Sequence, residues 1–178
     1  TFILGILIII PVAISGLILE YYFDKYFIDT SYYHILDTSI APITEETCKL
    51  LVIVMYCAKL KDFDEPMDGL VYGATASLGF AMFENILYVF DNDLSPWETT
   101  AVARAILSVP SHSFDGVILG FSMSYYIFFN KKIIFPLLGL LTTMTLHFSW
   151  NYFAWSDQIL FLLIVIQIII VTFLFKDL

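Results

Sequence analysis

The sequence has 178 residues, of which 60% are hydrophobic and 14% are charged, and its formal net charge is −9. So large an apolar share excludes an ordinary soluble domain and makes a lipid bilayer the natural solvent. The 8 lysines and arginines form no cluster with interleaved aromatic rings, which excludes a nucleic-acid partner. Because a span needs about 20 apolar residues, the length predicts one domain, 1–178, built as an all-α, polytopic transmembrane helix bundle of about six spans.

The six predicted spans cover about 2–19, 41–59, 68–90, 110–129, 133–154 and 158–175. The segment 20–37 between the first two is rich in tyrosine and acidic residues, and we expect it to be a loop on the membrane surface, because tyrosine rings favour the headgroup layer. The second span begins near Pro42, which suits the first turn of a helix. In the third span, Gly69 and Gly73 have the spacing that allows close contact between helices.

A shorter helix is predicted before the fourth span. Ser95 is a suitable N-cap, Pro96 suits the first helical position, and Glu98 stands where a capping box places it. This helix carries Arg104, which we expect to lie in the membrane interface or to have a structural role. Pro110 predicts a bend before the more apolar run.

The lysines and arginines alternate between the predicted loops. Two lysines fall in each of the loops near 59–66 and 130–132, and Lys176 lies at the C-terminus. The loop near 20–38 has only Lys25, and the loops near 91–96 and 155–158 have none. Cytoplasmic loops are enriched in these residues. The alternation therefore predicts a multi-pass protein of a cell membrane with both termini in the cytoplasm.

Several ionisable side chains lie inside the apolar spans, where an unpaired charge costs roughly 3 kcal/mol or more. They belong to pairs spaced three or four residues apart on one helix face, namely Glu45 with Lys49, Glu84 with Tyr88, His112 with Asp115, and His147 with Asn151. We count their depth from the outer helix ends at about 1.5 Å per residue, which puts the glutamates and histidines about 5–12 Å below the extracytoplasmic boundary. For Glu45 and Glu46 this count places them one turn into their span. The common depth predicts one shared polar pocket near the extracytoplasmic leaflet.

These residues carry a family resemblance. Glu45-Glu46-Thr47-Cys48-Lys49 resembles the EExxK motif of the PrsW intramembrane peptidases, and Phe83-Glu84 followed by Tyr88 is similar to the family's FExxxY motif. His112, and His147 with Asn151, resemble its histidine motifs. The motif core covers about 41–152, in order and on separate predicted helices. The family belongs to a larger group that includes CAAX prenyl endopeptidases and bacteriocin-processing enzymes.

The resemblance implies a single transmembrane protease domain that hydrolyses peptide bonds of membrane-anchored protein substrates, such as anti-sigma factors, in a prokaryotic plasma membrane. Hydrolysis needs an activated water and a stabilised oxyanion. Glu45 or Glu46 is then expected to be the general base. His112 would help to position the water, and His147 with Asn151 would polarise the scissile carbonyl. Supporting roles are expected for Lys49, Glu84, Tyr88 and Asp115.

A metal site is the alternative within the same fold, because two histidines and a glutamate are a usual ligand set for catalytic zinc. Glu45, His112 and His147 would hold such a divalent ion. The HExxH spacing is absent from the sequence, however, so glutamate chemistry without a metal cofactor is favoured. Cys48 and Cys57 are nine residues apart on one predicted helix and give no zinc or redox signal.

Two other functional classes remain open from the sequence. Buried carboxylates and histidines also form proton relays, which are typical of a proton-coupled transporter or channel. Such a protein should have polar residues throughout the membrane, whereas these lie in the outer third. A catalytically silent membrane scaffold is the other class, because the larger group contains a non-catalytic scaffold subunit. The sequence indicates neither the physiological substrate nor an oligomeric state.

Overall fold

A computed structural model describes residues 1–90 and 96–176. Over these residues the protein is all-α, as predicted, and contains no strand. The helices are α1 (Phe2–Leu7), α2 (Ile9–Phe27), α3 (Tyr33–Met55), α4 (Pro66–Phe90), α5 (Trp97–Ala103), α6 (Val109–Ser124), α7 (Ile134–Tyr152) and α8 (Asp157–Lys176). Short turns complete the helical structure, one 3-10 turn at Cys57–Lys59 and two π-helical turns at Arg104–Ser108 and Tyr125–Phe129.

Three of the helical segments are long and apolar enough to cross a membrane, judged by length and composition: Phe2–Phe27, Pro66–Phe90 and Asp157–Lys176. The other predicted spans correspond to α3, α6 and α7; α6 has only 16 residues, and α3 and α7 carry charged or polar motif residues. The third, fifth and sixth predicted spans coincide closely with α4, α7 and α8. The protein is therefore a multi-pass helical membrane protein.

The connection between the first two spans is much shorter than predicted. The segment 20–37 was expected to be a surface loop, but α2 continues to Phe27 and α3 already begins at Tyr33. No glycine or proline occurs between Gly16 and Pro42 to end a helix, and tyrosine-rich sequence can stay helical. Pro42 consequently lies inside α3 rather than in its first turn.

The predicted helix before the fourth span begins at Trp97, with Pro96 at the N-cap position rather than the first helical position. The proposed Ser95 cap lies outside the described residues. A π-helical turn at Arg104–Ser108 joins α5 to α6, just before Pro110. Because a proline has no N–H to donate to the preceding helical turn, the wider hydrogen bonding of a π turn is a suitable local solution.

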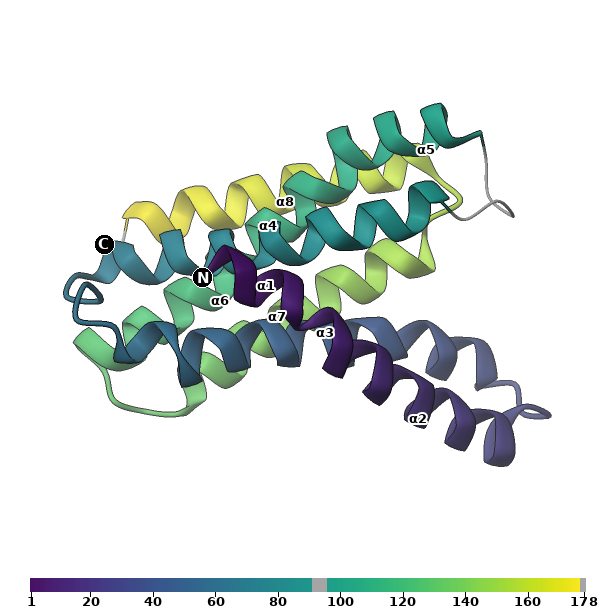
Figure 1. Ribbon diagram of the computed structural model, residues 1–178, viewed down its shortest axis with the longest axis horizontal. Coiled ribbons are helices and arrows are strands. Elements are labelled where there is room, and N and C mark those ends of the chain that lie inside the picture. The colour runs from purple at the N-terminus through teal and green to yellow at the C-terminus, as the bar shows by residue number, and fades with distance from the viewer. Residues whose placement is uncertain (91–95, 177–178) are drawn as a thin grey trace.

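The connections between helices gather at the two ends of the bundle (Figure 1). The lysine-bearing connections before α4 and before α7 lie at one end, together with the C-terminal end of α8. The N-terminus lies nearer this end than the other (Figure 1), with Thr1 Oγ1 3.8 Å from Cys57 Sγ. The connections between α2 and α3 and between α7 and α8 lie at the other end. The structure thus has the alternation that the lysines indicated, and the assignment of the lysine-rich end to the cytoplasm stays a prediction.

Helices α4 and α6 pack backbone against backbone. A Cβ atom at Gly73 would collide with the carbonyl oxygen of Gly116, and one at Gly120 would collide with that of Gly69. The predicted close contact at Gly69 and Gly73 is therefore present. Small residues allow such an approach in a membrane, where no hydrophobic force drives helices together. Both helices carry residues of the polar cluster described below, so this spacing also positions that cluster.

Gly73→Ala should lower the free energy of unfolding by about 1–3 kcal/mol, because the added methyl group must push α4 and α6 apart. The matched control is Gly16→Ala, since a Cβ at Gly16 would lie 3.8 Å from Ile40 Cγ2, an ordinary van der Waals distance. Alanine favours a helix over glycine, so this control should be as stable as the parent or more so. Thermal unfolding in detergent makes the comparison. Equal melting temperatures for Gly73→Ala and the parent would contradict the close contact.

Candidate active site

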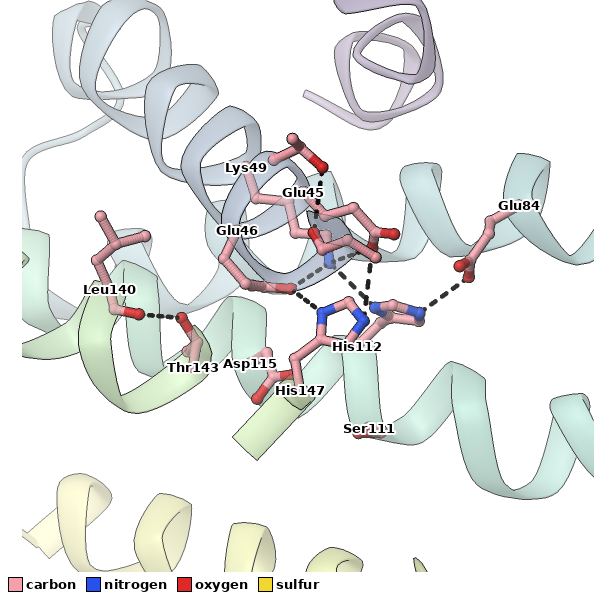
Figure 2. Close-up of polar contacts among 12 residues, drawn as sticks. Glu45, Glu46, Lys49, Glu84, Ser111, His112, Asp115, Leu140, Thr143 and His147 are labelled. Carbon is pink, nitrogen blue, oxygen red and sulfur yellow. Dashed lines mark hydrogen bonds and ion pairs between the residues drawn. The ribbon is translucent and has the colours of Figure 1, made fainter. Parts of the chain in front are cut away.

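Four helices bring polar side chains into one buried cluster (Figure 2). The members are Glu45, Glu46 and Lys49 from α3, Glu84 from α4, His112 and Asp115 from α6, and His147 from α7, each at most 9% exposed. The structure therefore brings these predicted residues together. The depth count was wrong for α3, because Glu45 lies twelve residues after Tyr33 rather than one turn into the helix. It still meets the other helices because α2 and the first turns of α3 extend past the rest of the bundle (Figure 1).

Lys49 lies at the centre of the cluster and is 0% exposed. Its Nζ donates to Glu46 Oε1 at 2.7 Å, is 3.0 Å from His112 Nδ1, and is 3.6 Å from Glu45 Oε2. Because an ammonium group can only donate, His112 Nδ1 is the acceptor and His112 Nε2 carries the ring proton. This Nε2 donates to Glu84 Oε2 at 3.0 Å. Both nitrogens of His112 are therefore engaged.

His147 is held in a different way. Its Nδ1 lies 2.9 Å from Glu46 Oε1, and because an ionised carboxylate can only accept, this nitrogen is the donor. Its Nε2 lies 3.9 Å from Glu45 Oε2, too far for a direct hydrogen bond. Within the described part of the chain Glu45 Oε2 has no hydrogen-bond partner. Glu45 Oε2 and His147 Nε2 can therefore each form a further hydrogen bond.

A cavity of about 40 Å³ lies beside this pair. Its lining includes seven of the nine predicted site residues, Glu45, Glu84, Tyr88, His112, Asp115, His147 and Asn151. The other two, Glu46 and Lys49, lie behind the lining and contact it through the hydrogen bonds given above. A buried water needs a cavity volume of about 10–15 Å³, so this cavity can hold water beside Glu45.

Arg104 also belongs to the site, although the sequence placed it in the interface or in a structural role. Its Nη2 donates to Glu84 Oε2 at 2.5 Å and its Nε donates to Asn85 Oδ1 at 2.6 Å. The guanidinium carbon lies 3.8 Å from the centroid of the Tyr88 ring. A signal was present in the sequence, because Glu84 has no basic residue three or four positions away and a membrane carboxylate needs a partner.

Gln167 in α8 is the second residue that sequence reasoning did not select. It is 1% exposed, and its Nε2 donates to Ser111 Oγ and to Asp115 Oδ1, both at 3.0 Å. These bonds link Asp115 and the start of α6 to α8. An amide in the middle of a long apolar run was the available signal, since such groups join helices in a membrane.

The donor atoms of the cluster fit a divalent metal ion. Two sets of three residues have ligand atoms within 4.8 Å of one another, Glu45 with Glu46 and His147, and Glu45 with Glu84 and His112. Carboxylate and imidazole donors suit zinc, and Glu45 Oε2 and Glu46 Oε2 are buried without hydrogen-bond partners among the described residues. The first set fits better, because both nitrogens of His112 are already engaged. The trio expected from the sequence, Glu45 with His112 and His147, is neither of these sets.

Comparisons with known proteins agree with the motif analysis. The model of a family described as "PrsW family intramembrane metalloprotease" matches residues 1–175. A "Protease PrsW" from Bacillus subtilis (strain 168) is 30% identical over 167 residues, which cover 92% of this chain and 72% of that protein. One from Geobacillus kaustophilus (strain HTA426) is 45% identical over 92 residues, 52% of this chain and 39% of the relative.

A third "Protease PrsW", from Clostridioides difficile (strain 630), is 27% identical over 135 residues, which cover 71% of this chain. The chain spans 39% and 57% of the lengths of the Geobacillus and Clostridioides relatives. No solved structure matches the chain. The family match extends over almost the whole chain and the family's motif residues meet in one buried cluster, and so the chain belongs to the PrsW family of intramembrane proteases.

Proposed function

We propose that this protein hydrolyses a peptide bond in membrane-anchored protein substrates and that Glu45 is the general base. One observation carries the proposal. Glu45 Oε2 and His147 Nε2 lie 3.9 Å apart beside a cavity that can hold water. A water in that cavity would contact Glu45, whose Oε2 has no hydrogen-bond partner in the described chain.

The reaction follows from the groups around this water. Glu45 accepts a proton from the water as the water oxygen forms a bond to the scissile carbonyl carbon. The side-chain amide of Asn151, one turn after His147 in α7, donates to the developing oxyanion. Glu45 then gives the proton to the leaving amine as the C–N bond breaks. Glu46 does not contact the cavity in this scheme and instead orients His147 through Nδ1.

Lys49 favours the version without a metal. Its ammonium group lies 2.7 Å from Glu46 Oε1 and 3.6 Å from Glu45 Oε2, and so it already supplies positive charge to both carboxylates. A divalent ion bound to the same two carboxylates would lie close to this ammonium and would be repelled by it. Glutamate chemistry is therefore the version of the reaction that we favour.

A metal-dependent version is the second candidate, and the donor set Glu45, Glu46 and His147 favours it, as does the description of the family as metalloproteases. A bound divalent ion would act as a Lewis acid toward the scissile carbonyl.

The test uses purified protein in liposomes with a single-span reporter protein, assayed before and after exhaustive chelation. We expect the cleavage rate to be unchanged by chelation. Loss of activity that zinc restores would establish the metal-dependent version, and no cleavage in any state would favour a silent scaffold.

The location of the cluster supports a substrate cut near the extracytoplasmic face, such as an anti-sigma factor. Glu84 lies six residues before the end of α4, and His147 lies five residues before the end of α7. These helix ends are opposite the lysine-rich end of the bundle (Figure 1). A reporter cleaved by this protein should therefore be cut in the half of its span nearer the extracytoplasmic side.

Arg104→Gln should lower kcat for reporter cleavage by about 10–100-fold, the usual range for a residue that orients a group of the site. Glutamine keeps a polar group at this position but cannot provide the charged fork that holds Glu84. Among the described residues, Glu84 would then keep one hydrogen-bond partner, His112, and the cavity wall would be less ordered. The matched control is Glu98→Gln, an exposed position in the first turn of α5. A kcat equal to that of the parent would show that Arg104 has no part in the site.

A further inference from the structure

A second hollow meets the cavity at α3. This groove runs between α2 and α3 and has a volume of about 480 Å³, compared with about 40 Å³ for the cavity beside Glu45. Ala41 and Glu45 line both spaces, so the groove and the cavity are neighbours at this part of α3. The groove is large enough for several residues of another chain, whereas the cavity is not.

The lining of the groove changes along its length. Its middle is apolar, with Val12 and Leu17 from α2 and Ile40 from α3, and two acidic residues, Glu20 and Asp37, line it as well. Both acidic residues are exposed and lie toward the α2–α3 connection. Figure 1 shows α2 and the start of α3 diverging from the other helices as a hairpin at the lower right.

We propose that this groove binds the substrate in an extended conformation, with an apolar stretch along its middle and a lysine or arginine of the substrate paired with Glu20 and Asp37. This inference rests on the proposed function and adds a substrate class to it. Two observations point to a ligand at this place. The acidic pair is complementary to a basic residue, and at the inner end Glu45, the proposed general base, lines both the groove and the cavity.

The spacing of the groove sets a register for the substrate. Asp37 and Glu45 are eight residues apart on α3, which corresponds to about 12 Å along a helix. An extended chain covers about 3.3 Å per residue. A basic residue held by Asp37 would therefore lie about four residues from the bond that Glu45 attacks, on the extracytoplasmic side. The preferred substrates are membrane-anchored segments with a lysine or arginine at that distance.

The first experiment measures cleavage of two single-span peptides in liposomes by the full chain, one with lysine and one with glutamate four residues outside the cut. An exposed ion pair contributes little, so we expect about a twofold to fivefold preference in kcat/KM for the lysine peptide. Asp37→Lys should reverse the preference. Asp29→Lys is the control, because Asp29 is an exposed acid of the neighbouring connection that does not line the groove, and it should keep the parent's preference. Equal rates for both peptides with the parent would overturn the inference.

The second experiment measures binding independently of cleavage. Glu45→Gln protein carries a photo-crosslinking amino acid in place of Leu17, which lines the groove, or of Ile18, which is similarly exposed but does not. We expect the lysine peptide to crosslink at position 17 and not at position 18. Crosslinking at 17 to the same chain or to a second copy would mean that another segment occupies the groove, and the inference would be wrong. Crosslinking to the peptide without any cleavage by the parent would contradict the proposed function but would still support the groove as a peptide-binding site.

Discussion

Glu45→Gln should abolish most of the peptide cleavage by this protein, lowering kcat/KM by about 10²–10⁴-fold, the contribution of a general base. Glutamine has nearly the same size and can still hydrogen-bond to a water, but its amide cannot take a proton at neutral pH. The substitution replaces one carboxylate oxygen of a side chain that lines the cavity with an amide nitrogen. Cleavage of a single-span reporter in liposomes measures the effect.

Two variants make the result specific. Glu65→Gln changes an exposed glutamate at the start of α4 in the same chemical way and should cleave at the parent's rate. Glu46→Gln should also reduce cleavage, but with a lower melting temperature, because Glu46 Oε1 lies 2.7 Å from Lys49 Nζ and 2.9 Å from His147 Nδ1. Glu45→Gln should keep a melting temperature near that of the parent. Parent-like cleavage by Glu45→Gln would remove Glu45 from the role of base.

Lys49→Met should lower the free energy of unfolding by about 3–5 kcal/mol, the usual effect of removing one partner from a buried ion pair. Methionine fills a similar volume, so a cavity contributes little to the change. The loss arises because Glu46, which is 0% exposed, and Glu45 would keep their charges without the ammonium between them. His112 Nδ1 would also lose its donor. Equilibrium unfolding in detergent measures the difference from the parent.

A double variant of Lys49 and Glu46 distinguishes an unpaired buried charge from general damage to the core. Adding Glu46→Gln to Lys49→Met removes the charge that was left unpaired, so the double variant should be more stable than the single Lys49→Met variant. Lys59→Met is the matched control, because Lys59 is exposed and its loss should change little. A Lys49→Met protein as stable as the parent would mean that the buried ammonium does not hold the cluster together.

Much of the fold could be predicted because membrane helices are determined by local composition. Runs of apolar residues gave α4, α7 and α8 closely, and the glycine spacing at Gly69 and Gly73 gave the α4–α6 contact. The boundary between α2 and α3 was not predictable from the same signals. Tyrosine and acidic residues occur both in surface loops and in helices that extend beyond the hydrocarbon, and only the absence of glycine and proline favoured the helix.

The members of the site could be selected from the sequence, but their pairings could not. Each helix presented its polar residues on one face, which identified Glu45, His112 and His147 as candidates. Which nitrogen of each histidine is engaged depends on contacts between helices, and these distinguish His112, with both nitrogens bonded, from His147, with Nε2 facing Glu45. Arg104 joins the site through a residue twenty positions away, which no helical spacing encodes.

The most direct measurement is mass spectrometry of the products formed when the purified protein acts on a single-span reporter in ¹⁸O-labelled water. We predict a cut in the half of the span nearer the α2–α3 connection, with ¹⁸O from the water incorporated into the new carboxyl terminus. Hydrolysis by a water that Glu45 activates requires both results. Intact reporter after incubation with well-folded protein, or a cut in the half nearer the lysine-rich end, would contradict the assignment of this cluster as a peptide-hydrolysing site.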